Sequence, residues 1–119
     1  MSRIINNQTI KGKKMFLNKL NKKVVCADGF TMSVQAHNGA YCEPRVDDGY
    51  YSTVEIGFPS LVEGAILSYA EEPDNPTGTV YGWVPVDLVR HVIDRHGGIV
   101  EGQVPKGVPV YGVTHSRDY

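Results

Sequence analysis

The residues best suited to metal binding or nucleophilic chemistry in this chain are its cysteines and histidines. They are Cys26, Cys42, His37, His91, His96 and His115. A compact zinc site draws ligands from close pairs such as C-x2-C or H-x3-H, and no pair here has that spacing. We therefore predict no metal site, and we interpret the histidines as surface or helix-terminal residues.

A nucleophilic mechanism needs a nucleophile, a base and an orienting group that converge in space. The one candidate is the thiol of Cys42, with nearby His37 as the base and Glu43 or Asp47 as the orienting carboxylate. No local signature accompanies this set, so a buried cysteine beside a turn histidine is the simpler interpretation. Two cysteines suit reduced, buried thiols, and a Cys26–Cys42 disulfide is the alternative if their strands are neighbours.

Carboxylates and glycines offer no better catalytic set. The pairs Asp47-Asp48 and Glu71-Glu72 lie in or beside predicted turns, where solvation explains them better than acid–base catalysis does. The chain also lacks the Gly-x-x-x-x-Gly-Lys loop that holds phosphates. We therefore predict that the protein is not an enzyme and carries no cofactor.

Arginines and large aromatic residues are the remaining candidates, and they point to binding. Arginine forms bidentate contacts with carboxylates and phosphates, and exposed tyrosine and tryptophan are typical of protein interfaces. We predict a binding surface drawn from Tyr41, Arg45, Tyr50, Tyr51, Trp83, Arg90 and Arg95. The alternatives are tyrosines at the edge of the core and helix arginines that pair with acidic residues, as Arg90 would with Asp94.

Arg45 is of particular interest because it stands alone in an acidic stretch. It is the only basic residue between positions 23 and 90. Pro44 fixes its own φ, so the chain leaves the preceding strand in a defined direction. Either Arg45 pairs with Glu43, Asp47 or Asp48, or it faces an anionic group on a partner or ligand.

Charge is distributed unevenly along the chain. Residues 1–23 carry seven basic side chains and no acidic one, whereas the remainder carries five basic and thirteen acidic residues. The basic residues are Arg3, Lys11, Lys13, Lys14, Lys19, Lys22 and Lys23. We interpret residues 1–14 as a flexible basic arm. Nucleic-acid binding through the six lysines is an alternative function, although aromatic residues are scarce among them.

Composition predicts a single globular domain over residues 15–119. Of the 119 residues 41% are hydrophobic and 21% are charged, and the formal net charge is −1. No apolar run approaches the ~18–20 residues that span a bilayer, and the N-terminus lacks the apolar region of a secretory signal. We expect a cytoplasmic protein without membrane contact.

Alternating and apolar runs predict a mainly antiparallel sheet of about five strands. The expected strands are residues 23–27, 30–36, 50–58, 65–70 and 79–84. Asp28-Gly29 predicts a hairpin turn between the first two. In the third, Tyr50, Val54 and Phe58 are expected on one face and Tyr51 on the other.

One helix is predicted in the C-terminal half. After Pro85, Val89, Val92 and Ile93 recur at the helical period until Gly97-Gly98 ends the run. Residues 102–119 are expected to add an edge strand. The fold class is therefore α+β, with one helix packed on one face of the sheet. The other face would need cover, which a homodimer with a tyrosine-rich interface would supply.

Several segments together resemble a group of small uncharacterised proteins encoded by bacteriophages and prophages. The resemblance covers about residues 15–100, and its segments are DGFTMSVQA, YCEPR, VEIGFPS, YAEEP and TVYGWVP. It implies an accessory protein that acts in the cytoplasm of a bacterial host. No site residue is carried over from it.

These observations lead to three functional hypotheses. The first is a non-enzymatic binding protein that occludes a host bacterial protein, such as a defence component, in the manner of an anti-CRISPR inhibitor. The second is a protein that sequesters a small molecule or nucleotide through an arginine and a stacking aromatic ring. The third is nucleic-acid binding through the basic arm.

Overall fold

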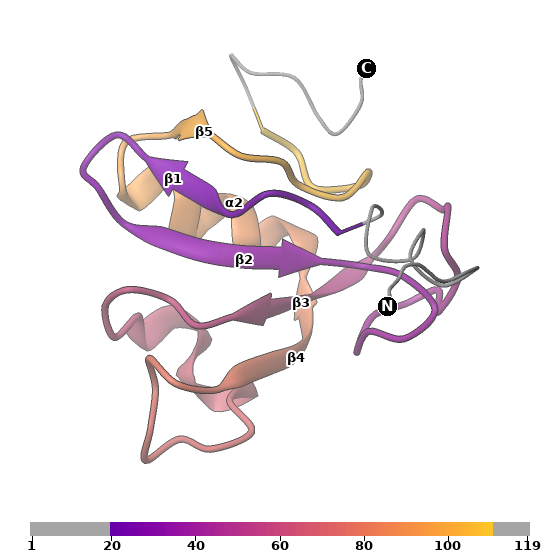
Figure 1. The fold of residues 1–119 in the computed structure, drawn as a ribbon, viewed down its shortest axis with the longest axis horizontal. Helices are drawn as coiled ribbons and strands as arrows, with labels where there is room; N and C mark the ends of the chain where they lie inside the picture. The colour runs from indigo at the N-terminus through magenta and orange to yellow at the C-terminus, as the bar shows by residue number, and fades with distance from the viewer. Residues whose placement is uncertain (1–19, 111–119) are drawn as a thin grey trace, which may run out of the picture.

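The computed structural model describes residues 20–110 (Figure 1). The predicted arm at 1–14, Lys19 and His115 lie outside the described residues. Lys22 and Lys23, by contrast, are exposed at the start of the described chain.

The described chain forms one five-stranded antiparallel sheet in the order β4-β3-β2-β1-β5. The strands are β1 (Val24–Cys26), β2 (Thr31–Gln35), β3 (Thr53–Gly57), β4 (Val80–Pro85) and β5 (Ile99–Glu101). A 3-10 helix, η1 (Gly64–Tyr69), precedes β4, and the α-helix α2 (Val86–Arg95) follows it. In Figure 1 the α-helix lies behind the sheet. The predicted α+β class is therefore confirmed.

The hairpin between β1 and β2 forms where Asp28-Gly29 predicts it. Gly29 has a φ of 94°, a left-handed conformation that glycine adopts without steric cost. The amide of Cys26 donates to the carbonyl oxygen of Phe30 across the turn at 2.8 Å. The alternating residues that follow, Met32 and Val34, are fully buried, so the period of two identifies the core face.

The α-helix covers this core face with a narrow apolar stripe. Val89, Val92 and Ile93 are buried, and the polar residues between them face outward. Gly97 and Gly98 follow the helix with φ values of 91° and 92°, which end it and start the return to β5. The predicted helix and its glycine stop are confirmed.

The predicted strand at 65–70 is wrong, because these residues form η1. Only Ile66 is buried there, so the short apolar run packs one side chain into the core instead of alternating across a sheet. The amides of Ile66 and Ala70 donate to the carbonyl oxygens of Glu63 and Leu67, three residues back. A short apolar run has no period that separates a strand from a helical turn.

The expected face assignment over residues 50–58 is wrong at both ends. Strand β3 begins only at Thr53, and before it Tyr51 is buried while Tyr50 is exposed. The hydroxyl of Tyr51 donates to the carbonyl oxygen of Val46 at 2.8 Å. At the other end Phe58 has a φ of 50°, so it leaves the strand pleat and its side chain is exposed.

The C-terminal edge strand is shorter and earlier than predicted. It is β5, which pairs with β1 and ends at Glu101. Gly102 follows with a φ of 103°, which an extended strand does not accommodate. Residues 102–110 instead run irregularly along the domain, where Val104 and Val108 are buried. Residues 111–119 of the predicted strand lie outside the described residues.

Candidate functional site

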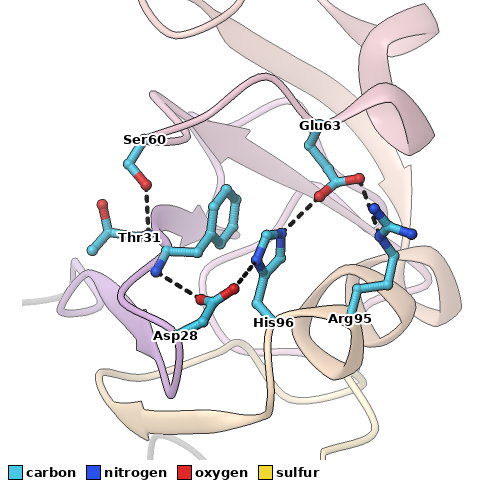
Figure 2. Close-up of polar contacts among 7 residues, drawn as sticks. Asp28, Thr31, Ser60, Glu63, Arg95 and His96 are labelled. Carbon is cyan, nitrogen blue, oxygen red and sulfur yellow. Dashed lines mark hydrogen bonds and ion pairs between the residues drawn. The ribbon is translucent and has the colours of Figure 1, made fainter.

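A histidine at the end of α2 lies between two carboxylates (Figure 2). The Nδ1 atom of His96 is 2.7 Å from Oδ2 of Asp28, and its Nε2 atom is 2.8 Å from Oε1 of Glu63. The other carboxylate oxygen of Glu63 is 3.5 Å from Nε of Arg95. We call Asp28, His96 and Glu63 the histidine bridge.

Three separate segments position the bridge. Asp28 belongs to the β1–β2 turn, where its Oδ1 atom accepts the amide of Phe30 at 2.9 Å. The ring of Phe30 stacks on the imidazole of His96, with ring centroids 3.9 Å apart and planes inclined by 9°. Glu63 lies immediately before η1, and its side chain is only 4% exposed. The bridge thus connects the hairpin turn, the end of α2 and the chain entering η1.

The charges of the bridge determine its protonation. Burial lowers the pKa of His96, but the hydrogen bonds and charges of Asp28 and Glu63 outweigh burial and raise it above 6.5. The amide of Phe30, and then His96, lower the pKa of Asp28 below 3.8. When His96 is protonated, its imidazolium donates one N–H to Asp28 and the other to Glu63. In that form the ring has no lone pair to accept a proton or bind a metal ion.

An exposed apolar segment follows β3 and ends at the bridge. Phe58, Leu61 and Val62 are 56%, 58% and 60% exposed, and we call them the apolar loop. Beside them Ser60 exchanges two hydrogen bonds with Thr31: its hydroxyl oxygen accepts the Thr31 amide at 2.9 Å, and its amide donates to the Thr31 carbonyl oxygen at 2.8 Å. These bonds and Glu63 anchor the loop.

A second exposed aromatic feature lies on β4. Val54 faces Val84 and Ile56 faces Tyr81, so Gly82 and Trp83 together oppose one residue of β3 and form a β-bulge. Trp83 has a φ of 52° and is exposed. The ring of Tyr41 stacks on it at a centroid distance of 4.9 Å. The structure thus brings together two of the predicted binding residues, Tyr41 and Trp83.

The turn around Arg45 holds further predicted binding residues. Arg45 is exposed and forms no ion pair with any residue of the described range 20–110. Its acidic neighbours have other contacts: Asp47 accepts the amide of Asn38 at 3.0 Å, and Asp48 lies 2.9 Å from Lys106. The ammonium of Lys106 also lies 5.6 Å from the ring centroid of Tyr50, which is exposed.

The remaining predicted binding residues have structural contacts. Tyr51 is buried in the core, as described above. Arg90 pairs with Asp94 at 3.2 Å, which is the predicted i, i+4 contact. Arg95 is exposed beside Glu63.

The sequence candidate for catalysis does not assemble. The thiol of Cys42 donates to the carbonyl oxygens of His37 and Pro44, and Nδ1 of His37 accepts the amide of Gly39 instead. Burial raises the pKa of Cys42, and burial with the charge of Asp28 raises the pKa of Cys26 to about 11. Both cysteines are free, buried thiols.

The described residues hold neither a metal-binding cluster nor a helix that could span a membrane. No group of three or more His, Cys, Asp or Glu residues in that part of the chain is arranged to hold a metal ion. None of the helices formed by residues 20–110 has the length and apolar character that crossing a membrane requires.

Sequence reasoning did not identify the histidine bridge or the apolar loop as functional candidates. The sequence predicts Asp28 as a turn residue and His96 as a surface or helix-terminal histidine, and in the structure Asp28 lies in the β1–β2 turn and His96 directly follows α2. Their contact joins residues 68 positions apart, and no local spacing encodes it. The one local signal was the pair Leu61-Val62 after Pro59-Ser60, two apolar residues outside every predicted strand.

Comparisons with protein-family models, with curated proteins and with solved structures find no match to this chain.

Proposed function

We propose that this protein is a non-enzymatic protein-binding module whose contact surface includes the apolar loop. Following the resemblance described above, we propose that it is a phage or prophage accessory protein and that its partner is a protein of the bacterial host, which it occludes. The observation that carries the proposal is that Phe58, Leu61 and Val62 are exposed on an anchored segment.

The conformation of Phe58 supports this role. A bulky residue at a φ of 50° is an outlier that costs on the order of 1–3 kcal/mol, and such strain concentrates at functional positions. The strand pleat would direct this side chain to the core, where Ile56 lies. The positive φ instead leaves the ring in solvent, where a partner can contact it.

The energy available from the loop suits a protein interface. Fully burying a large apolar side chain contributes about 1.5–3 kcal/mol, so burying the exposed parts of these three contributes about 3–5 kcal/mol in total. The loop is anchored before binding, by Ser60 on Thr31 and by Glu63 on His96. Little conformational entropy is therefore lost when a partner docks.

The basic and aromatic residues would extend this surface. Arg95 is exposed and lies beside Glu63, which is the residue that follows the apolar loop in the sequence. Its guanidinium would form part of the polar rim of the interface. Trp83, which is exposed and stacks on the half-buried Tyr41, is a further aromatic residue of the kind that dominates interface energies.

Affinity capture from a host lysate tests the proposal with two matched variants. Leu61→Asp places a charge in the apolar loop, and Val100→Asp places the same charge on another exposed apolar residue, in the edge strand β5. We expect the unmodified protein and Val100→Asp to retain one stoichiometric partner that Leu61→Asp loses, with equal thermal stability for all three. Absence of a partner, or equal capture by Leu61→Asp, would contradict the proposal.

A further inference from the structure

We propose that the histidine bridge makes the anchoring of the apolar loop depend on pH: the ring of His96 links Glu63 to Asp28 while it carries two N–H groups, and losing one proton breaks that link. The consequence for binding rests on the proposed function of the apolar loop. The pH dependence of the bridge does not rest on that proposed function, because the contacts of His96 lie within the folded chain.

The geometry makes the link conditional on the second proton. Both ring nitrogens of His96 lie within 2.8 Å of a carboxylate oxygen. A neutral imidazole has one N–H donor and one lone pair. The lone pair would then face a carboxylate oxygen that also carries negative charge, and the two repel. One of the two contacts must therefore open, and either opening separates Glu63 from Asp28.

The surroundings of His96 determine which contact is vulnerable. The described charged groups that face the ring are Asp28 from the β1–β2 turn and Glu63 from the chain before η1. Arg95, from α2, reaches the other oxygen of Glu63. The contact with Asp28 is the more vulnerable, because Asp28 is half-exposed and its carboxylate can turn to water. Glu63 is buried, and deprotonation removes the positive charge of His96 that faces it. After deprotonation the exposed Arg95 is the one cation within ion-pair distance of Glu63 in residues 20–110.

The direction of the effect follows from the protonated state that the bridge favours. The pKa of His96 is raised above 6.5, so the bridge is complete at lower pH and opens as the pH rises through the raised value. The pKa of Asp28 is lowered below 3.8 by the amide of Phe30 and then by His96, so this carboxylate keeps its charge over the range in which His96 titrates. While His96 is protonated the apolar loop is anchored to both the hairpin turn and α2, and above the raised pKa of His96 it is anchored less firmly.

Hydrogen exchange of the full-length free protein, measured by NMR, tests this without a partner. The amide of Ser60 reports on the loop because it donates to Thr31 directly beside the bridge. We expect its protection factor to fall on the order of tenfold as the ring of His96 titrates, which is the effect of losing one charge-assisted hydrogen bond. Amides in the centre of β2 should keep their protection.

Three variants separate the bridge from other effects of pH. In His96→Gln the Ser60 protection factor should be low at every pH, and in the control His91→Gln, an exposed residue of the same helix, it should behave as in the unmodified protein. In Asp28→Asn the ring titration and the Ser60 transition should move together to lower pH, because one of the charges that raise the pKa of His96 is gone.

A Ser60 protection factor that does not change across the His96 titration would overturn the proposal. So would a pH-dependent change that persists in His96→Gln. These results are distinct from failure of the proposed function, which is measured by capture with Leu61→Asp. A working bridge with no Leu61-dependent partner would leave the bridge standing and remove only its role in binding.

Discussion

The carboxylate of Glu63 is the part of the histidine bridge whose removal should cost the most stability. It is the buried member, at 4% exposure, and its two oxygens contact His96 and Arg95. Glu63→Ala removes the acceptor of one hydrogen bond to a charged ring, worth about 1.5–3 kcal/mol, and leaves a small cavity. The pair with exposed Arg95 adds little, because surface ion pairs contribute about 0–1 kcal/mol. We expect a loss of about 3 kcal/mol in the free energy of unfolding at pH 6.

The isosteric variant gives a graded result. Glu63→Gln keeps the volume of the side chain and an amide oxygen that accepts from Nε2 of His96, but it removes the charge. We expect a smaller loss, about 1–1.5 kcal/mol at pH 6, because a hydrogen bond to a neutral acceptor is weaker. The control is Glu72→Ala, which removes an exposed carboxylate from the loop between η1 and β4 and should change stability by less than about 0.5 kcal/mol.

The pH dependence of these losses is part of the prediction. A raised pKa in the folded state contributes stability that is complete below 6.5 and is lost as the pH rises through the folded value. Urea unfolding at pH 6 and at pH 9 should therefore show a smaller cost of Glu63→Ala at the higher pH. A cost below about 1 kcal/mol at pH 6, or the same cost at both pH values, would refute the reasoning.

Two further predictions concern the backbone and the exposed arginine. Gly107→Ala should destabilise the fold by at least about 2–3 kcal/mol, because φ is 110° and a Cβ would clash with the backbone of Tyr51. Gly98→Ala, at a similar φ with nothing near its Cβ, should cost only about 1–2 kcal/mol in the same urea unfolding experiment. Arg45→Ala should change the unfolding free energy by less than about 0.5 kcal/mol, since Arg45 has no ion pair within the described residues. A loss above 1 kcal/mol in thermal or urea unfolding would show that Arg45 has a structural partner instead.

Elements with a sustained period were predictable from the sequence. Met32 and Val34 alternate with polar neighbours, and Val89, Val92 and Ile93 recur at the helical spacing, so each pattern has one secondary structure that buries its apolar residues together. The turn at Asp28-Gly29 was also predictable from neighbouring residues, because glycine tolerates the left-handed backbone that the hairpin needs. The fold class follows from these elements.

Elements without a sustained period were not predictable. The run at residues 65–70 is too short to distinguish a strand from a 3-10 helix. In the structure it forms η1, and of its side chains only that of Ile66 is buried in the core. Tyr51 is buried because it precedes β3 and so lies outside the alternation of Val54 and Ile56, and no local pattern marks where that strand begins.

The same distinction between local patterns and tertiary packing applies to the candidate site. From the sequence it follows that Arg45 is the only basic residue between positions 23 and 90, and reduced, buried cysteines are predicted; both inferences rest on residue types and their order along the chain. Only the tertiary structure placed His96 between Asp28 and Glu63 and left Phe58 in solvent. The physical reason is range: secondary-structure patterns act over a few residues, whereas the bridge depends on three chain segments that meet only when the sheet and the helix pack together.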